Sequence, residues 1–394
     1  MRSVVVTSAC RTPIGRFLGG LADLRAPDLG AVVVREAIRR SGIAPEQVEE
    51  VILGCVLQAG MGQAPARQAA RAAGVPDAVG ALTVNKVCGS GLKAVILAAQ
   101  AIRCGDADVI VAGGMESMSN APYLLPEARR GVRLGHGRVL DSLVFDGLRD
   151  AAHDVHMGET AERVSETYGV GREDQDRFAV RSHERALAAQ AQGRFGKEIV
   201  PVTLRDRKGV EGYCAVDEGP RPHTSAERLG RLKPVFREGG TVTAGNASQI
   251  SDGAAALVLM SEEKAAALGA RPLARITGYA TGGLAPEWVM MAPKDAIERL
   301  CARSSCTLDR FEVVEINEAF AVQIVALERE LHLDPERVNV HGGAVALGHP
   351  IGASGARVLT TLLHAMEGRS ARHGLASLCL GGGNAVALSV ERIG

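Results

Sequence analysis

The sequence Asn85-Lys86-Val87-Cys88-Gly89-Ser90-Gly91-Leu92-Lys93 leads directly into an apolar segment at residues 94–102. Residues 81–87 are predicted to be extended. The small residues after Cys88 allow a sharp turn, and a helix is then expected to run to about Arg103, before Gly105. A thiol at a helix start lies near unpaired backbone N–H groups and the positive end of the helix dipole, which favour the thiolate. Cys88 is therefore a candidate nucleophile; the alternative is a small buried cysteine at a tight turn.

Strand and helix patterns alternate along both ends of the chain. Apolar strands are predicted at residues 3–8, 51–56 and 108–115, the last ending in two glycines, with helices at 28–41 and 63–73. In the C-terminal part, strands at 273–278, 312–316 and 375–380 alternate with helices at 296–302 and from 352 onward. Alternating strands and helices predict an α/β fold.

Three short matches relate these two parts. Glu49-Glu50-Val51 matches Glu312-Val313-Val314 at an offset of 263, and Ser90-Gly91 matches Ser354-Gly355 at 264. Gly113-Gly114 matches Gly381-Gly382 at 268. Nearly constant offsets in the same order indicate an internal duplication.

The second copy passes straight from its glycines to a strand at 385–390, whereas the first copy reaches its equivalent, at 254–260, only after a long insertion. The insertion has polar helices predicted at 160–168 and 172–192. We expect three units: residues 1–118 with 251–270, an inserted domain at 119–250, and residues 271–394. Such a cap would lie where α/β folds bind ligands, beyond the strands' carboxyl ends.

Composition excludes several functions. The 394 residues carry 45 basic and 45 acidic side chains, so charge gives no attraction to nucleic acid or anionic membranes. The eight cysteines occur singly, without metal-binding spacing, and no GxxxxGK[ST] or strand-linked GxGxxG is present, so we expect no metal and no nucleotide. Singly spaced cysteines predict a reduced, cytoplasmic setting. We expect no membrane contact, because no leader is recognised and the longest apolar run is too short for a bilayer.

Four further stretches contain candidate functional residues. Asn317-Glu318-Ala319-Phe320-Ala321 follows a predicted strand, where Asn317 either holds a water or substrate or caps the next helix. His349 lies between Gly348 and Pro350, as a constrained base or a structural histidine.

Cys379 precedes Gly381 and its neighbouring glycines at a strand end. It is either a second, proton-moving thiol beside N–H groups for an oxyanion, or a packed thiol. The polar loop at 245–253 suits pantetheine amides or phosphate, but it is also an ordinary loop.

Together these stretches resemble the thiolase family over the whole chain. The matching motifs, in family order, are Val87-Cys88-Gly89-Ser90-Gly91, Gly113-Gly114-Met115-Glu116-Ser117-Met118-Ser119, Asn317-Glu318-Ala319-Phe320, Gly348-His349-Pro350-Ile351-Gly352-Ala353-Ser354-Gly355 and Cys379-Leu380-Gly381-Gly382-Gly383. The resemblance implies duplicated α/β halves in a layered αβαβα arrangement, with an inserted loop domain.

The resemblance also implies roles for individual residues. Cys88 would carry the acyl group as a thioester, His349 would take its proton, and Cys379 would remove or return a proton at the α-carbon. Asn317, through a water, and His349 would form one oxyanion site, and the N–H groups of Cys88 and Gly381 the other. Two thiols make chemical sense, because one cannot be acylated and act as base at once.

The insertion resembles the family's coenzyme A-binding loop domain. The resemblance places CoA contacts at seven positions: His156, Met157, Arg221, Ala244, Gly245, Ser248 and Phe320. It implies CoA thioesters as substrates, no permanently bound cofactor, and a homotetramer formed through the arginine-rich run at 129–138, with a dimer as the alternative. Two departures are Arg228, where a small hydroxyl residue is common, and residues 289–292, where two family glycines are replaced by bulkier residues.

The expected function is Claisen condensation of two acetyl-CoA to acetoacetyl-CoA and the reverse thiolysis. A degradative 3-ketoacyl-CoA thiolase for longer or bulky chains is the alternative within this chemistry. Outside it are a non-catalytic acyl-CoA-binding scaffold and a condensing enzyme fed by acyl carrier protein. The retained site residues argue against the scaffold, and Cys379 argues against the carrier-protein enzyme.

Overall fold

The computed structural model describes residues 2–205 and 209–393. A ten-stranded sheet runs through this part in the order β14-β15-β16-β13-β1-β12-β5-β3-β4, with β2 (Gly15–Arg16) paired to β12. Five strands come from the N-terminal half: β1 (Val4–Arg11), β3 (Glu50–Gly54), β4 (Gly80–Val84), β5 (Val109–Ser117) and β12 (Ser251–Ser261). Four come from the C-terminal half: β13 (Ala274–Gly283), β14 (Val313–Ile316), β15 (His373–Leu380) and β16 (Asn384–Arg392).

The two halves of the sheet repeat one topology on either side of a short seam. At the seam, β1 pairs with β13 through Val5↔Arg275 and Val6↔Ala274. Outward from it, an antiparallel pair and then a parallel pair follow on each side, as β12–β5–β3 and as β16–β15–β14. The counterpart of β4 is reduced to a parallel bridge between Val314 and Val338.

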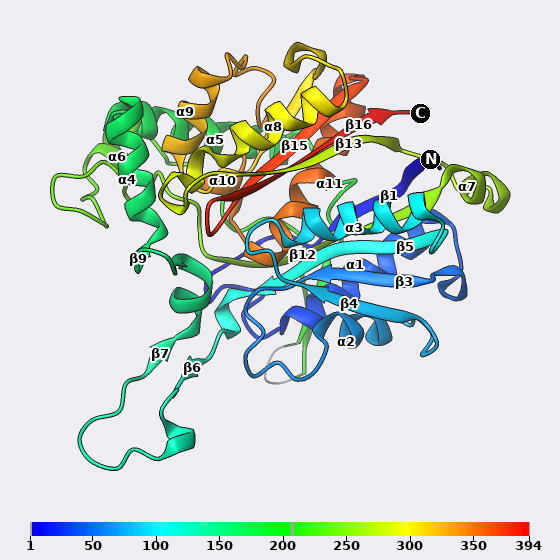
Figure 1. Ribbon diagram of the computed structural model, residues 1–394, viewed down its shortest axis with the longest axis horizontal. Helices are drawn as coiled ribbons and strands as arrows, with labels where there is room; N and C mark the ends of the chain where they lie inside the picture. Colours follow the sequence, from blue (N-terminus) through cyan, green and yellow to red (C-terminus); the bar gives the residue numbers. More distant parts are fainter. Residues whose placement is uncertain (1, 206–208, 394) are drawn as a thin grey trace.

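Helices divide the molecule into five layers (Figure 1). Helices α1 (Ala26–Ser41) and α2 (Pro65–Ala72) cover the outer face of the N-terminal half, and α8 (Ala292–Arg303) and α9 (Ala321–Glu330) that of the C-terminal half. Between the two halves lie α3 (Ser90–Cys104) and α11 (Ile351–Arg369), whose apolar residues form the central core. The α/β class and the layered αβαβα arrangement predicted from the sequence are confirmed.

Helix α3 lies in the most buried layer. The segment 87–104 is long and apolar enough, by composition alone, to cross a membrane, with a mean hydropathy of 1.3. In the fold it is a core helix, because α3 packs against β5, β3 and α11. Its apolarity is therefore explained by burial of one broad face in the core, while residues such as Leu97 stay partly exposed and Cys104 is exposed.

The two central helices meet at a pair of glycines. A Cβ atom on Gly91 would lie 2.7 Å from the backbone nitrogen of Ala356, and one on Gly355 would lie 2.2 Å from that of Leu92. The contacts are reciprocal: each glycine faces the residue that follows the other glycine in its own helix. Positions 91 and 355 are thus equivalent, as the offset of 264 predicted.

Strand β5 differs from its prediction. Gly113 and Gly114 were expected to end the strand, but β5 continues through them to Ser117. Both glycines serve close approach instead, because a Cβ would lie 2.1 Å from the carbonyl oxygen of Ala255 or of Gly352, respectively. The equivalent strands β5 and β15 begin at Val109 and His373, which are 264 positions apart. Gly113-Gly114 and Gly381-Gly382 are 268 positions apart, so this match does not join equivalent positions of the two halves.

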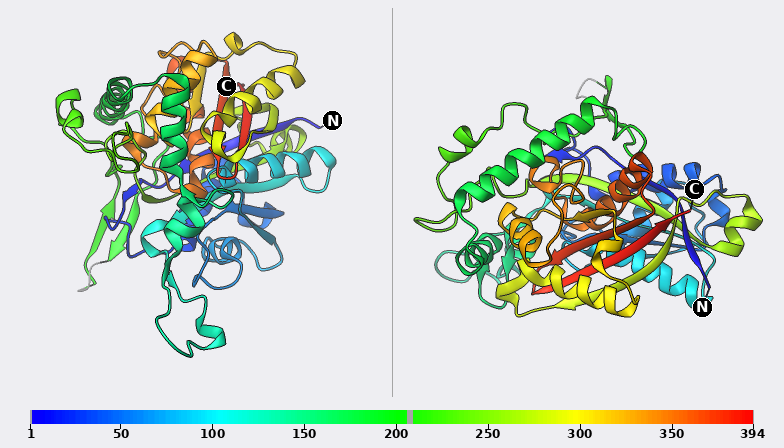
Figure 2. Two further views of the ribbon diagram at one scale, coloured as in Figure 1. Left: turned by 60° about the vertical axis from the view of Figure 1, so that its left-hand side comes forward. Right: turned by 90° about the horizontal axis from the view of Figure 1, so that it is seen from above.

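The inserted segment covers one side of the C-terminal half and sends out an arm. Helix α5 (Arg172–Ala191) packs on α9 and on α10 (Ala344–Leu347), as Figure 2 shows from two sides. The arm leaves the body along β6 and β7 (Figure 1). The remaining helices and strands are β6 (Tyr123–Leu124), β7 (Leu140–Asp141), β8 (Arg149–Asp150), β9 (Val155–His156), α4 (Met157–Tyr168), β10 (Val202–Arg205), β11 (Glu211–Cys214), α6 (Ala226–Gly230) and α7 (Glu262–Leu268).

A buried ion cluster fixes the insertion to the sheet. Arg11, at the end of β1, donates from Nε to Glu198 and from Nη1 to Asp217, both at 2.6 Å. All three side chains are buried. Because breaking a buried pair leaves an uncompensated charge, these contacts hold the insertion in one position on the body.

Candidate active site

A cavity of about 290 Å³ lies between the two halves and the insertion. Its walls include residues that follow β4, β5, β14 and β15, so it lies beyond the carboxyl ends of parallel strands, where α/β folds bind ligands. The lining residues are Val87, Cys88, Met118, Gly147, Leu148, His156, Met157, Val235, Phe236, Thr243, Ala244, Ala247, Ser248, Gln249, Ile250, Val289, Met290, Ala319, Phe320, His349, Ile351, Cys379 and Gly381. The cavity thus brings together Cys88, His349, Cys379 and Gly381, which are far apart in the sequence.

Cys88 lies in a rigid turn between β4 and α3. Val87 adopts a left-handed conformation with φ +47°, which is costly for a β-branched residue. The turn is held by Ser90, whose Oγ accepts from the N–H of Lys86 at 2.8 Å and donates to the carbonyl of Val87 at 2.6 Å. A Cβ on Gly89 would lie 2.1 Å from Leu380, so the turn fits directly against the end of β15.

The Cys88 thiol is neutral in the resting site. Burial raises its pKa to about 12, although the backbone N–H groups of Cys88 and Gly381 lower it. Backbone N–H groups do favour the thiolate, as the sequence predicted, but desolvation outweighs them and the thiol stays protonated. A base must take the proton as the thiol attacks.

His349 lies on the same cavity wall as Cys88, and its ring is held by two side chains. Ser354 Oγ donates to the carbonyl of Pro350 at 2.9 Å and lies 2.6 Å from His349 Nδ1. When the serine proton is donated to Pro350, the matching tautomer of His349 carries its proton on Nδ1 and keeps a lone pair on Nε2. Burial, followed by the charge of Arg357, lowers the pKa of His349 to about 3, so the ring is neutral.

Asn317 lies behind His349 rather than on the cavity wall. It is fully buried at the end of β14, and its Nδ2 lies 3.4 Å from His349 Nε2. The amide therefore fixes the second edge of the ring. Its own Oδ1 is buried without a hydrogen-bond partner among the described residues.

Cys379 is the last residue but one of β15, on the same cavity as Cys88. Burial, and then the nearby Cys88, raise its pKa far above the usual range of a thiol. The side chain of Gln323, on α9, lowers the pKa of Cys379 and so favours its thiolate, and its Nε2 is buried with no hydrogen-bond partner among the described residues. Gln323 Oε1 accepts from the N–H of Ala319 at 3.2 Å, which orients the amide. Sequence reasoning missed Gln323, because nothing in its surroundings distinguishes it from a core glutamine.

Glu116 is a second residue that sequence reasoning did not assign. Its buried carboxylate accepts from the backbone N–H groups of Val56 at 3.0 Å, Leu57 at 3.1 Å and Gly352 at 2.8 Å. Burial raises its pKa to about 7, although these donors favour the charged form. Glu116 thereby ties the start of α11, three residues after His349, to the N-terminal half that carries Cys88. The match of residues 113–119 to a family motif was the available signal.

Five of the seven predicted CoA contacts line the cavity. His156 Nδ1 accepts from Gly158 N at the start of α4, and its ring stacks on Phe236 at 4.7 Å between centroids. Phe236 in turn contacts Phe320 edge-on at 6.2 Å. The lining positions are His156, Met157, Ala244, Ser248 and Phe320.

Arg221 and Gly245 are not among the described residues that line the cavity. Arg221 is exposed, and its backbone N–H donates to His183 at 3.1 Å. Gly245 is buried, and a Cβ there would meet the side chains of Leu229 and Leu232. Both stay predictions as CoA contacts.

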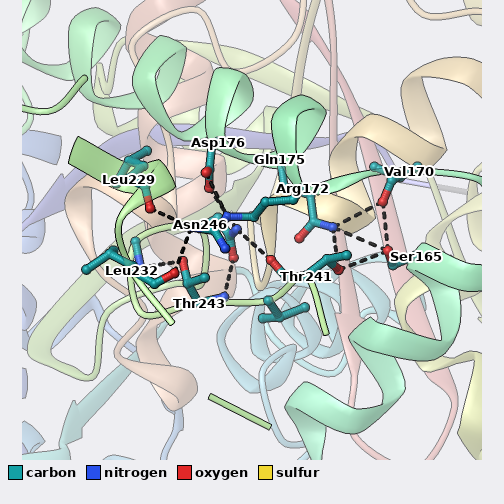
Figure 3. A network of polar contacts seen from close by, with 12 residues as sticks. Ser165, Val170, Arg172, Gln175, Asp176, Leu229, Leu232, Thr241, Thr243 and Asn246 are labelled. Carbon is teal, nitrogen blue, oxygen red and sulfur yellow. Dashed lines mark hydrogen bonds and ion pairs between the residues drawn. The ribbon is translucent and has the colours of Figure 1, made fainter. Parts of the chain in front are cut away.

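A polar network holds the loop that supplies Thr243 and Ala244 to the cavity (Figure 3). Asn246 accepts from the N–H of Thr243 at 2.8 Å and donates to Asp176 on α5 at 3.0 Å. Gln175, also on α5, donates to Thr241 Oγ1 at 2.8 Å. The loop position is therefore set by a helix of the insertion rather than by the sheet.

The two departures from the family pattern have different locations. Val289 and Met290 line the cavity, at the end of a short 3₁₀ segment (Pro286–Met291) that precedes α8. Arg228 is exposed on α6, with Nη1 3.2 Å from the carbonyl of His223, away from the cavity wall. Among the described residues, no group of three or more His, Cys, Asp or Glu side chains is arranged to hold a metal ion.

Comparisons with known proteins cover the whole chain. The thiolase N-terminal domain family matches residues 4–263, and the thiolase C-terminal domain family matches residues 270–392. Proteins named acetyl-CoA acetyltransferase from Pseudomonas aeruginosa and Cupriavidus necator are 55% and 53% identical to it over 392 residues, covering 100% of each chain. The crystal structure of the Bacillus anthracis acetyl-CoA acetyltransferase, 46% identical, superposes with a TM-score of 0.98 over 100% of this chain and 99% of that one.

Proposed function

Because the chain belongs to the thiolase family, we propose that it condenses two acetyl-CoA to acetoacetyl-CoA and CoA, and catalyses the reverse thiolysis. The observation that carries the proposal is the single cavity whose walls contain Cys88, Cys379 and His349. The names of the similar Pseudomonas and Cupriavidus proteins support the same reaction.

The first half-reaction loads Cys88. As its sulfur attacks the carbonyl carbon of acetyl-CoA, His349 Nε2 accepts the thiol proton. The N–H groups of Cys88 and Gly381 would stabilise the developing oxyanion; their influence on the pKa of the Cys88 thiol supports this role. The carbon–sulfur bond to CoA then breaks, the CoA sulfur takes the proton of the Cys379 thiol, and an acetyl thioester remains on Cys88 while Cys379 is left as a thiolate.

The second half-reaction forms the carbon–carbon bond. Cys379, with its thiolate favoured by Gln323, removes a proton from the methyl carbon of a second acetyl-CoA. Nε2 of His349, protonated in this step, and Asn317 behind it are suited to stabilise the enolate oxygen. The enolate carbon attacks the Cys88 thioester, and Cys88 leaves as a thiolate that takes its proton back from His349 Nε2. CoA thioesters are substrates here, and the proposal needs no permanently bound cofactor.

The cavity supports a short acyl group. Its volume of about 290 Å³ is at the low end for small-molecule sites, and apolar side chains such as Met118, Leu148 and Met290 fill its walls. Two bulky residues at 289–290 therefore favour the acetoacetyl product over the degradative alternative with longer chains.

A substrate-length profile tests the proposal. Steady-state thiolysis rates are measured with acetoacetyl-CoA and with 3-ketoacyl-CoAs of increasing length, while intact mass spectrometry follows the acyl-enzyme. We expect kcat/KM to be highest for acetoacetyl-CoA and to fall with chain length. A profile that rises with length would support the degradative alternative, and absence of turnover with all substrates would reject the enzyme.

We further propose a homotetramer in the cytoplasm, with a dimer as the alternative. Apolar side chains exposed on the projecting arm support self-association: Tyr123, Leu125, Val132 and Leu134. Sedimentation of the full chain measures the oligomeric state.

A further inference from the structure

Two cysteines outside the cavity lie side by side where α8 ends. Cys301 is in the last turn of α8, and Cys306 is in the segment that follows. Both side chains are partly exposed and pack at the border of the same apolar cluster. They are free thiols, and the reaction proposed above uses neither of them.

The helix end itself brings these two residues together. The N–H of Cys306 donates to the carbonyl of Cys301 at 3.1 Å, and the N–H of Ser305 donates to the carbonyl of Ala302 at 3.4 Å. Ser305 is left-handed, with φ +48°. These bonds form a Schellman motif, whose geometry places the side chains of its first and last residues in contact. Most helices use this contact for two apolar side chains; here both are thiols.

We propose that Cys301 and Cys306 form a dithiol that closes to a disulfide when it meets a small-molecule disulfide, such as oxidised glutathione. The reaction is separate from the chemistry of the cavity, and the inference does not depend on the proposed function. Four observations support the proposal. The two cysteine side chains are adjacent, and the backbone at the helix end fixes their separation. Both thiols are partly exposed, and neither is paired in another disulfide.

The exchange balances in two steps. Burial and the neighbouring Cys306 raise the pKa of Cys301 to about 12, which disfavours a first attack by Cys301, and the scheme therefore begins at Cys306. Its thiolate attacks one sulfur of the external disulfide, which breaks and releases one thiolate, leaving Cys306 in a mixed disulfide. Cys301 then loses its proton and attacks the Cys306 sulfur, releasing the second thiolate. Two thiols are oxidised to one disulfide, and the external disulfide is reduced by two electrons to two thiols.

Tryptic mapping of the full-length protein tests the proposal, because Arg303 separates the two cysteines. After incubation with oxidised glutathione and alkylation of the remaining thiols, we expect peptides 300–303 and 304–310 to appear as one disulfide-linked species. Reductant should separate them. Closure after the first attack is intramolecular, so glutathione should remain on Cys306 only transiently.

Two controls define the outcome. Cys301→Ser should abolish the linked peptides and leave glutathione on Cys306, with thiolysis unchanged, since residue 301 is outside the cavity. Cys104, an exposed single cysteine, should accumulate only the mixed disulfide. Peptides with residues 301 and 306 alkylated separately, or stable glutathione on Cys306 in the unaltered protein, would overturn the proposal.

Discussion

Helices α3 and α11 are equivalent elements of the two halves, yet they begin differently. Gly91 and Gly355 contact each other's helices reciprocally, so the offset of 264 makes Cys88 the counterpart of Gly352. Helix α11 begins at Ile351 and already includes that position, whereas α3 begins only at Ser90. The delayed start of α3 leaves Cys88 in a turn that a left-handed Val87 directs into the cavity.

The difference shows how one repeated helix pair supplies two kinds of group. On the N-terminal side a shortened helix exposes a nucleophile. On the C-terminal side the longer helix begins two residues after His349, and its own Ser354 orients the imidazole. Glu116 then joins the two helix starts through Gly352. The following predictions test this division of roles, from the largest expected effect to the smallest.

Cys88→Ser should have the largest effect, because it removes the thiol that is the proposed nucleophile at the start of α3. We expect kcat for thiolysis to fall by about 10⁴-fold or more and the acyl-enzyme to disappear from intact mass spectra. Cys104→Ser, at the other end of α3, is the matched control and should keep its rate. Normal turnover by Cys88→Ser would refute the assignment.

Cys379→Ser should separate the two half-reactions. The serine hydroxyl is too weak a base for the α-carbon, so we expect condensation to fall by about 10³-fold. Acylation of Cys88 by acetyl-CoA should remain within roughly tenfold, since that step uses His349. Rapid-quench mass spectrometry measures acylation, and a coupled assay measures condensation; equal loss of both would contradict a separate carbon base.

Glu116→Gln should break the link between the two helix starts. Both carboxylate oxygens of Glu116 accept hydrogen bonds from backbone N–H groups. The NH₂ group of a glutamine would point its own hydrogens at one of these N–H groups, and so would the O–H of a protonated Glu116. We expect kcat to fall by about tenfold with little change in KM.

The pH profile distinguishes this positioning role from general damage. Since the pKa of Glu116 is about 7, activity of the unaltered protein should fall as the pH drops through 7 and this carboxylate takes up a proton. His349, at about 3, and Cys88, at about 12, do not titrate in that window. Glu116→Gln should lack this decline; a profile parallel to that of the unaltered protein would argue against the role.

The smallest expected effect concerns the glycine contact between the helices. An alanine Cβ at position 355 would lie 2.2 Å from the backbone nitrogen of Leu92. An alanine Cβ at position 91 would lie 2.7 Å from the backbone nitrogen of Ala356. We therefore expect Gly355→Ala to destabilise the fold by about 3 kcal/mol and Gly91→Ala by about 1–2 kcal/mol. Gly368→Ala, near the open end of α11, should be neutral or slightly stabilising. Thermal unfolding midpoints rank the stabilities of the three variants. Equal midpoints for Gly91→Ala and Gly355→Ala would contradict the expected difference between the two positions.

The fold class and the main site residues were predictable because their signals are local. Alternation of apolar runs with helical patterns predicted the α/β layers, and the helices expected at 160–168 and 172–192 correspond to α4 (Met157–Tyr168) and α5 (Arg172–Ala191). Cys88, His349 and Cys379 were recognisable because each lies among small residues that a turn or strand end requires. The site roles themselves stay predictions until the variants are measured.

Several features depended on residues that meet only in three dimensions. Sequence patterns end β5 at Gly113-Gly114, but the carbonyls of Ala255 and Gly352 explain these glycines inside the strand. Gln323 has no sequence signal of its own, and Glu116 is marked only by the family motif at residues 113–119, because the partners of both residues come from other segments.

The amino-acid sequence by itself determined which elements form, that they repeat, and which side chains are chemically capable. Tertiary structure alone decided the protonation of Cys88 and His349, because desolvation depends on what packs over a group and not on its neighbours in the chain. It also decided which predicted CoA contacts reach the cavity wall, since that depends on how α5 and the sheet hold the loops between them.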